Sequence, residues 1–217
     1  MNTSNRAFGF IDRLIIQLDQ GVRTIFGQPE QNRPHLQPGM DLAEPALSAR
    51  ERKHTAGLIR VDHTGEVCAQ ALYQGQALTA RSSEVRARLQ QSAEEENDHL
   101  VWCAERLKQL NSHKSYLNPL WYLGSFAMGA IAGWAGDKWS LGFVAETERQ
   151  VVKHIDHHLE SLPGQDTKSR AILEQMREDE SYHASVALES GGAELPAPIK
   201  MTMRFMSKVM TGTAFYV

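Results

Sequence analysis

The sequence has 217 residues and a formal net charge of −3, with 41% hydrophobic and 23% charged residues. This length and composition suit one soluble domain with its own core, and the charge does not favour a nucleic-acid partner. The only cysteines are Cys68 and Cys103, which argues against a disulfide scaffold, a zinc ribbon and a rubredoxin-like iron centre. Because Asp12, Arg13 and Asp19 interrupt the first apolar stretch, we expect no secretory signal and a reduced protein on the cytoplasmic side.

Residues 1–46 are predicted to hold an amphipathic helix followed by a proline-rich connector. Hydrophobic residues recur in the helix at steps of three and four: Phe8, Ile11, Ile15, Leu18, Val22 and Ile25. This stripe is compatible with covering the rest of the protein and with contacting a membrane. Prolines 29, 34, 38 and 45 then mark a polar connector over residues 28–45.

Residues 47–217 are predicted to be all-α, with four long helices that form a bundle. Ser48 and Glu51 have the spacing of a capping box, so the first helix should begin there and run to about residue 80. The second should begin after Ser82 or Ser83 and run to about residue 111. The third and fourth are expected over residues 140–161 and 167–189, because Pro163-Gly164 and Gly191-Gly192 end them.

These four helices carry a repeated set of metal-binding residues. Two of them contain Glu-x-x-His, a spacing that places both side chains on one helical face, about 5–6 Å apart at Cβ. Each of the other two contributes one glutamate, and the sets recur at nearly the same offset, which indicates an internal duplication. The six candidate ligands are Glu66, Glu96, His99, Glu148, Glu180 and His183. This pattern matches the di-iron carboxylate bundle.

The chemistry of the set favours two iron ions. Four carboxylates that face one interior would repel each other, and two divalent metals would neutralise them. Carboxylates with a few imidazoles suit iron or manganese better than zinc. We expect Glu96 and Glu180 to bridge the metals, with Glu66 and Glu148 terminal and one histidine on each metal.

Several neighbouring residues are candidates for orienting the ligands. Tyr73 lies on the face of Glu66, where core packing is the alternative role. Asp62 could hold a ligand imidazole or be a surface acid. His63 and His154 are further candidates, whereas His157 and His158 are expected at the surface.

Residues 115–136 contain no charged side chain, a length within the range of a transmembrane helix. A single span would separate the two halves of the metal site. We therefore expect a long apolar crossover that lies on or in a membrane face, or one that is buried in the bundle. The final helix, after Pro196 and Pro198, has an apolar face beside Lys200, Arg204 and Lys208. It suits an anionic membrane surface or packing on the bundle.

The motifs resemble the demethoxyubiquinone hydroxylase family of ubiquinone biosynthesis. The resemblance covers roughly Leu58 to the C-terminus, and Val67-Cys68 departs from the usual aromatic-Gly pair of the family. Its segments are Arg60-Val61-Asp62-His63-Thr64-Gly65-Glu66, Tyr73-Gln74-Gly75-Gln76, Glu96-Asn97-Asp98-His99-Leu100, the glycine-rich crossover, Glu148 with His154, and Glu180 to His183.

The resemblance implies a ferritin-like di-iron monooxygenase with O2 as co-substrate. One oxygen atom would enter the ring of a demethoxylated polyprenyl benzoquinol, and the other would form water. It also implies a peripheral protein on the cytoplasmic side of the cell membrane, in a homo-oligomer or a ubiquinone-biosynthesis complex. The alternatives are a membrane-bound di-iron quinol oxidase of the alternative-oxidase kind, a ferroxidase or iron-storage protein, and a non-catalytic lipid-binding protein.

Overall fold

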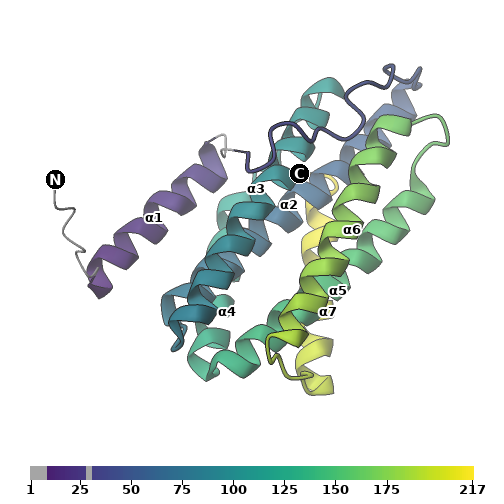
Figure 1. Cartoon of the computed structure of the whole chain (residues 1–217). Coiled ribbons are helices and arrows are strands. Elements are labelled where there is room, and N and C mark those ends of the chain that lie inside the picture. The colour runs from purple at the N-terminus through teal and green to yellow at the C-terminus, as the bar shows by residue number, and fades with distance from the viewer. Residues whose placement is uncertain (1–8, 28–30) are drawn as a thin grey trace, which may run out of the picture.

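The computed structural model describes residues 9–27 and 31–217, and in these ranges the chain is all-helical (Figure 1). Phe8 and the start of the connector, residues 28–30, lie outside the described ranges. The helices are α1 (Phe10–Phe26), α2 (Ala49–Thr79), α3 (Ser83–Gln109), α4 (Asn118–Ala135), α5 (Asp137–Ser161), α6 (Thr167–Glu189) and α7 (Ala197–Ala214). α2, α3, α5 and α6 form the bundle, α4 is the crossover, and α1 and α7 pack outside it. The predicted all-α fold is confirmed.

Local sequence signals set most helix boundaries. The Ser48 side chain accepts a hydrogen bond from the Glu51 backbone N–H, and the Glu51 side chain accepts one from the Ser48 N–H, as the capping-box prediction requires. α5 begins at Asp137, three residues before the predicted start. Gly136 separates it from α4 with a φ of 118°, a conformation that favours glycine.

α2 lies at the centre of the molecule and contacts α1, α3, α4, α5 and α7. For this reason almost every residue from Thr55 to Ala77 is buried, including polar ones. The largest apolar cluster joins α2, α3, α5 and α6 and includes Ile59, Ile155 and Leu173. Glu66 lies at the middle of the buried stretch, so the candidate site is deep inside the bundle.

The crossover α4 packs one face on α2 and exposes the other. A Cβ on Gly129 would overlap the backbone of Leu72, so this glycine allows the two helices to approach closely. The outer face carries exposed Leu120, Leu123 and Trp134. In the described ranges, no helix is both long enough and apolar enough to span a membrane.

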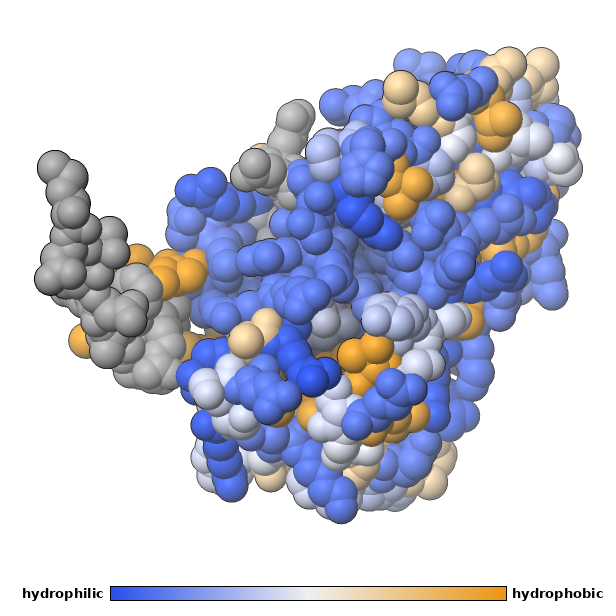
Figure 2. Space-filling view, viewed as in Figure 1, coloured by the Kyte–Doolittle hydropathy of each residue, from blue (hydrophilic) through white to orange (hydrophobic). Residues whose placement is uncertain are grey.

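α1 turns its polar face toward the bundle. Gln17 and Thr24 are buried, whereas members of the predicted apolar stripe, Ile11, Ile15, Leu18 and Val22, are each at least 59% exposed. Ile25, at the end of the stripe, is partly buried and packs near Leu100 and Tyr122, but the four exposed members do not cover the bundle. The face of the molecule that carries α3, α6 and the connector is mainly hydrophilic, with small separate hydrophobic patches (Figure 2).

Candidate metal centre

The four bundle helices bring the six predicted ligand residues into one buried cluster. Glu66, Glu96, His99 and Glu180 each offer a ligand atom, and these atoms lie within 4.8 Å of one another. His183 joins them, with its Nδ1 3.1 Å from Glu96 Oε1 and 3.5 Å from Glu180 Oε2.

The sixth residue, Glu148, is also buried. It accepts a hydrogen bond from the hydroxyl of Tyr73, which is fully buried beside it. Tyr73 therefore combines packing with the predicted role beside a candidate ligand.

Both imidazoles have the same arrangement. Their Nδ1 atoms point into the carboxylate cluster, where His99 Nδ1 is 2.8 Å from Glu96 Oε2 and 3.0 Å from Glu180 Oε1. Their Nε2 atoms point outward, so that His99 Nε2 donates to Asp179 Oδ2 at 3.0 Å and His183 Nε2 donates to Glu95 Oε2 at 3.0 Å. A carboxylate on Nε2 holds the proton there and leaves the Nδ1 lone pair free to bind a metal.

The orienting carboxylates cross between the two halves of the repeat. Asp179 directly precedes Glu180 in the second half and holds His99 of the first, while Glu95 directly precedes Glu96 in the first half and holds His183 of the second. Sequence analysis did not predict these roles. The repeat itself contains the signal, because an acidic residue precedes the glutamate of both Glu-x-x-His motifs.

The atoms of the cluster fit a pair of divalent cations. In the part of the chain that the structure describes, both carboxylate oxygens of Glu96 and of Glu180, Glu148 Oε2, and Nδ1 of both histidines are buried and make no well-directed hydrogen bond, although the Nδ1 atoms lie 2.8–3.5 Å from the oxygens of Glu96 and Glu180. Buried acceptors of this kind need a cation or a proton between them. Carboxylate oxygens with two imidazoles are the donor set that iron or manganese prefers.

Electrostatics in the cluster shift the pKa values of the carboxylic acids in two directions. Burial raises the pKa of Glu66 and that of Glu148, and the nearby charges of Glu180 and Glu96 raise both further. Burial alone would also raise the pKa of Glu96, but His99 and His183 outweigh it and hold that pKa below its ordinary value.

The pKa values of both imidazoles are raised. Burial alone would lower them, but the surrounding carboxylates outweigh this effect, above all Glu96 for His99 and Glu180 for His183. Protons on these groups therefore balance the charge of the cluster when no metal is bound.

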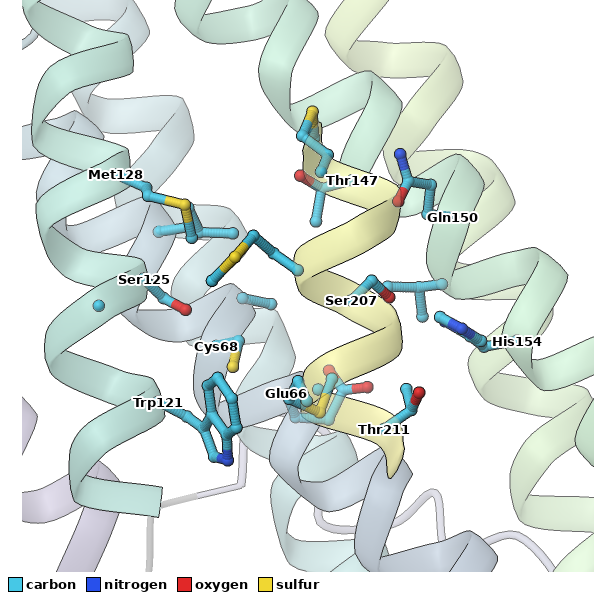
Figure 3. Close-up of a pocket in the computed structure, with 18 of the residues that line it drawn as sticks. Glu66, Cys68, Trp121, Ser125, Met128, Thr147, Gln150, His154, Ser207 and Thr211 are labelled. Carbon is cyan, nitrogen blue, oxygen red and sulfur yellow. The ribbon is translucent and has the colours of Figure 1, made fainter. Parts of the chain in front are cut away.

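An apolar cavity of about 350 Å³ adjoins the cluster, and Glu66 is part of its wall (Figure 3). α2 lines it between Val61 and Leu72. Labelled side chains of α4 and α5 approach it from opposite sides, and α7 passes between them. Met203, Met206 and Met210 of α7 line the cavity, so one face of this terminal helix packs on the bundle.

Of the remaining candidates, Asp62 and His154 line the cavity, whereas His158 and His63 are buried next to these positions in the sequence or the fold. Asp62 is buried and accepts a hydrogen bond from His158 Nδ1 at 2.8 Å, so it is not a surface acid, and the imidazole that it holds is not a predicted ligand. The predicted surface position of His158 is wrong, because this residue lies on the inward face of α5 beside Ile155 and Leu159. The His154 ring lines the cavity and stacks on His158. His63 is buried, and neither ring nitrogen has a partner within the described residues.

Comparison with solved structures supports the fold. A dodecameric thioferritin, the bacterioferritin-related protein from Bacteroides fragilis, superposes with a TM-score of 0.52 at 16% identity, over 66% of this chain and 88% of that chain. At this identity the similarity concerns the fold alone, which is ferritin-like.

Curated relatives match almost the whole chain. A protein from Nitrosococcus oceani is 58% identical over 98% of this chain and 99% of its own length. Proteins from Chromobacterium violaceum and Acinetobacter baumannii are each 55% identical, over 95% and 98% of this chain and 100% of their own lengths. All three are named 3-demethoxyubiquinol 3-hydroxylase. The family model described as ubiquinone biosynthesis protein COQ7 matches residues 53–214. This chain therefore belongs to the ubiquinone biosynthesis protein COQ7 family.

Proposed function

We propose that the protein is a 3-demethoxyubiquinol 3-hydroxylase, which uses O2 and two iron ions to hydroxylate the ring of a demethoxylated polyprenyl benzoquinol. One observation carries the proposal beyond the names of its relatives. Glu66 belongs both to the buried carboxylate–imidazole cluster and to the wall of the apolar cavity. A ring bound in this cavity would lie directly beside the metal centre.

The proposed metal ligands are the six residues of the repeat, and two of them suit bridging positions. Glu96 and Glu180 each approach Nδ1 of both histidines, His99 and His183, whereas Glu66 approaches Nδ1 of His99, at 3.6 Å. Iron bound there would supply the electrons and open coordination positions that O2 activation requires. One oxygen atom would enter the ring as a hydroxyl and the other would leave as water, with two electrons and two protons from a reductant.

The cavity offers an apolar surface with polar groups at a few points, as sites for small organic ligands do. Asp62 lines this cavity. Its Oδ2 is buried and has no hydrogen-bond partner in the described ranges, while its Oδ1 accepts a hydrogen bond from His158. It is therefore placed to accept a hydrogen bond from a quinol hydroxyl. The methionines of α7 and the apolar residues of α4 suit an isoprenoid tail, because flexible thioethers adapt to irregular apolar shapes.

The proposal includes peripheral attachment to the cytoplasmic side of a membrane, because the water-insoluble polyprenyl tail of the substrate lies in the membrane. Exposed apolar residues on three outer helices support it: Ile11, Ile15, Leu18 and Val22 on α1, Leu120, Leu123 and Trp134 on α4, and Met201 and Phe205 on α7. Exposed apolar side chains that gather on one helix face mark interaction sites. The family resemblance also predicts a homo-oligomer or a ubiquinone-biosynthesis complex, which sizing of the native particle tests.

The decisive experiment is anaerobic loading with Fe²⁺, followed by 18O2, a demethoxyquinol and a reductant, with mass analysis of the ring. The proposal predicts a hydroxylated ring that contains one labelled atom. A quinone without ring oxygen would instead indicate a quinol oxidase, and oxidised iron without any change in the quinol would indicate a ferroxidase. The substitution Glu180→Ala should abolish iron binding and hydroxylation together. Glu178→Ala, an exposed change on the same helix, is the matched control.

A further inference from the structure

The connector between α1 and α2 lies across α3 and α6 on the outside of the metal cluster (Figure 1). Trp102 of α3 donates a hydrogen bond to the Leu36 carbonyl at 3.1 Å. Further along, Glu44 pairs with the buried Arg106 at 2.9 Å and with Lys168 of α6 at 3.3 Å. The connector is therefore attached to both Glu-x-x-His helices.

Its closest approach to the metal centre is made by Arg33. The fully buried Asp98, inside the first Glu-x-x-His motif, accepts the backbone N–H of Asn32 at 2.7 Å and Arg33 Nε at 2.9 Å. The other end of the same guanidinium, Arg33 Nη2, donates to Asp179 Oδ2 at 2.7 Å. That oxygen also accepts the N–H of His99. One side chain thus joins α3 to α6 and fixes the carboxylate that orients His99.

The second half of the repeat has no equivalent contact within the described residues. The position of Asp98 is taken there by Tyr182, whose side chain is exposed. Both orienting carboxylates accept a hydrogen bond from a glutamine amide four residues earlier, Glu95 from Gln91 at 2.9 Å and Asp179 from Gln175 at 3.1 Å. Arg33 is the additional, charged partner of Asp179. The two halves of the centre have the same candidate ligands, but they differ in the residues that contact the orienting carboxylates.

We propose that Arg33 is a positioning residue for the metal centre. Metal binding by His99 then depends on the N-terminal connector, whereas metal binding by His183 does not. The inference rests on the six-residue metal centre of the proposed function. Its physical basis is the planar guanidinium, which can hold two carboxylates in fixed directions at once. Without Arg33, Asp179 would keep only the neutral amide of Gln175 on its Oδ1, and the Oδ2 atom that orients His99 would lose its charged partner.

The test is an anaerobic titration of the Arg33→Gln variant with Fe²⁺, in which calorimetry and near-infrared circular dichroism measure binding. One of the two equivalents should bind about 10–100-fold more weakly than in the wild type, the usual cost of losing a partner of a ligating histidine, and the other should be unchanged. Glu95→Gln should weaken the other equivalent. Arg177→Gln removes an exposed ion pair between α6 and Asp156 of α5, and it should leave both equivalents unchanged.

Two further variants separate positioning from general stability. Asp179→Asn should reproduce the effect of Arg33→Gln, and the double variant should be no weaker than Asp179→Asn alone, because Arg33 acts through Asp179. Arg33→Lys keeps the charge but cannot hold both carboxylates, so it should also weaken one equivalent. It takes the place of Arg33→Gln if that variant does not fold.

A wild-type isotherm for Arg33→Gln or Arg33→Lys would overturn the inference, as would equal weakening of both equivalents. Failure of the wild-type protein to bind iron would instead overturn the proposed function.

Discussion

Loading the protein with metal should release protons in a number that follows from its charge. Without metal, burial and the nearby charges of Glu96 and Glu180 raise the pKa values of Glu66 and Glu148, and the surrounding carboxylates outweigh burial and raise those of His99 and His183, so these four groups are the proton carriers of the cluster. Ligands must lose these protons to bind a metal, so two divalent ions should displace about four protons. By linkage, the apparent affinity per ion should rise about 100-fold per pH unit near neutrality.

Calorimetric titration with Fe²⁺ or Mn²⁺, under anaerobic conditions and in two buffers with different ionisation enthalpies, measures this number directly. The exposed substitution Glu178→Gln is a control that should release as many protons as the wild type. A release of less than about one proton per two ions would refute the assignment of these groups as ligands.

The same protons give the metal-free protein a characteristic pH dependence. Because the pKa values of these four groups are raised in the folded chain, it holds protons on them at pH values at which the unfolded chain has begun to release them. Each such proton lowers the free energy of unfolding by about 1.4 kcal/mol per pH unit as the pH rises. Thermal melts between pH 6.5 and 8 should show a falling melting temperature for the metal-free protein and a much smaller change for the loaded one. A pH-independent metal-free protein would contradict the charge assignment.

Two other predictions concern the outer helices. Gly129→Ala places a methyl group against the backbone of α2 and should lower the free energy of unfolding by about 1–3 kcal/mol in chemical denaturation, whereas Gly124→Ala, which meets open space, should be neutral or slightly stabilising. If both variants had the same stability, close packing of α4 would not matter. Replacing exposed Met201 or Phe205 of α7 with Ser should weaken binding to anionic vesicles about tenfold, a loss of about 1.4 kcal/mol. Tyr182→Ser, an equally exposed change on α6, should not weaken vesicle binding. An equal effect of all three substitutions would mean that α7 has no specific role in membrane binding and only packs on the bundle.

Most helix boundaries and the residues of the candidate site can be predicted from the sequence alone. Helix signals are local, so the Ser48 cap and the four long periodic segments could be placed within a few residues. The site was recognisable because a duplicated Glu-x-x-His has the same spacing in both halves, and a helix converts that spacing into a shared face. The division of the chain at residue 46 and the individual roles of the six ligands stay predictions.

Which helix faces pack against each other follows from the tertiary structure and not from the sequence pattern. The apolar stripe of α1 has the same sequence pattern whether it faces the bundle or solvent, and packing turned it outward. His158 is buried because α5 turns it toward Asp62. Arg33 and Asp179 are 146 residues apart in the sequence. They are in contact because the connector crosses α3 and α6, which lie side by side. Periodicity describes one helix at a time, whereas these contacts depend on the relative placement of several, which no local pattern encodes.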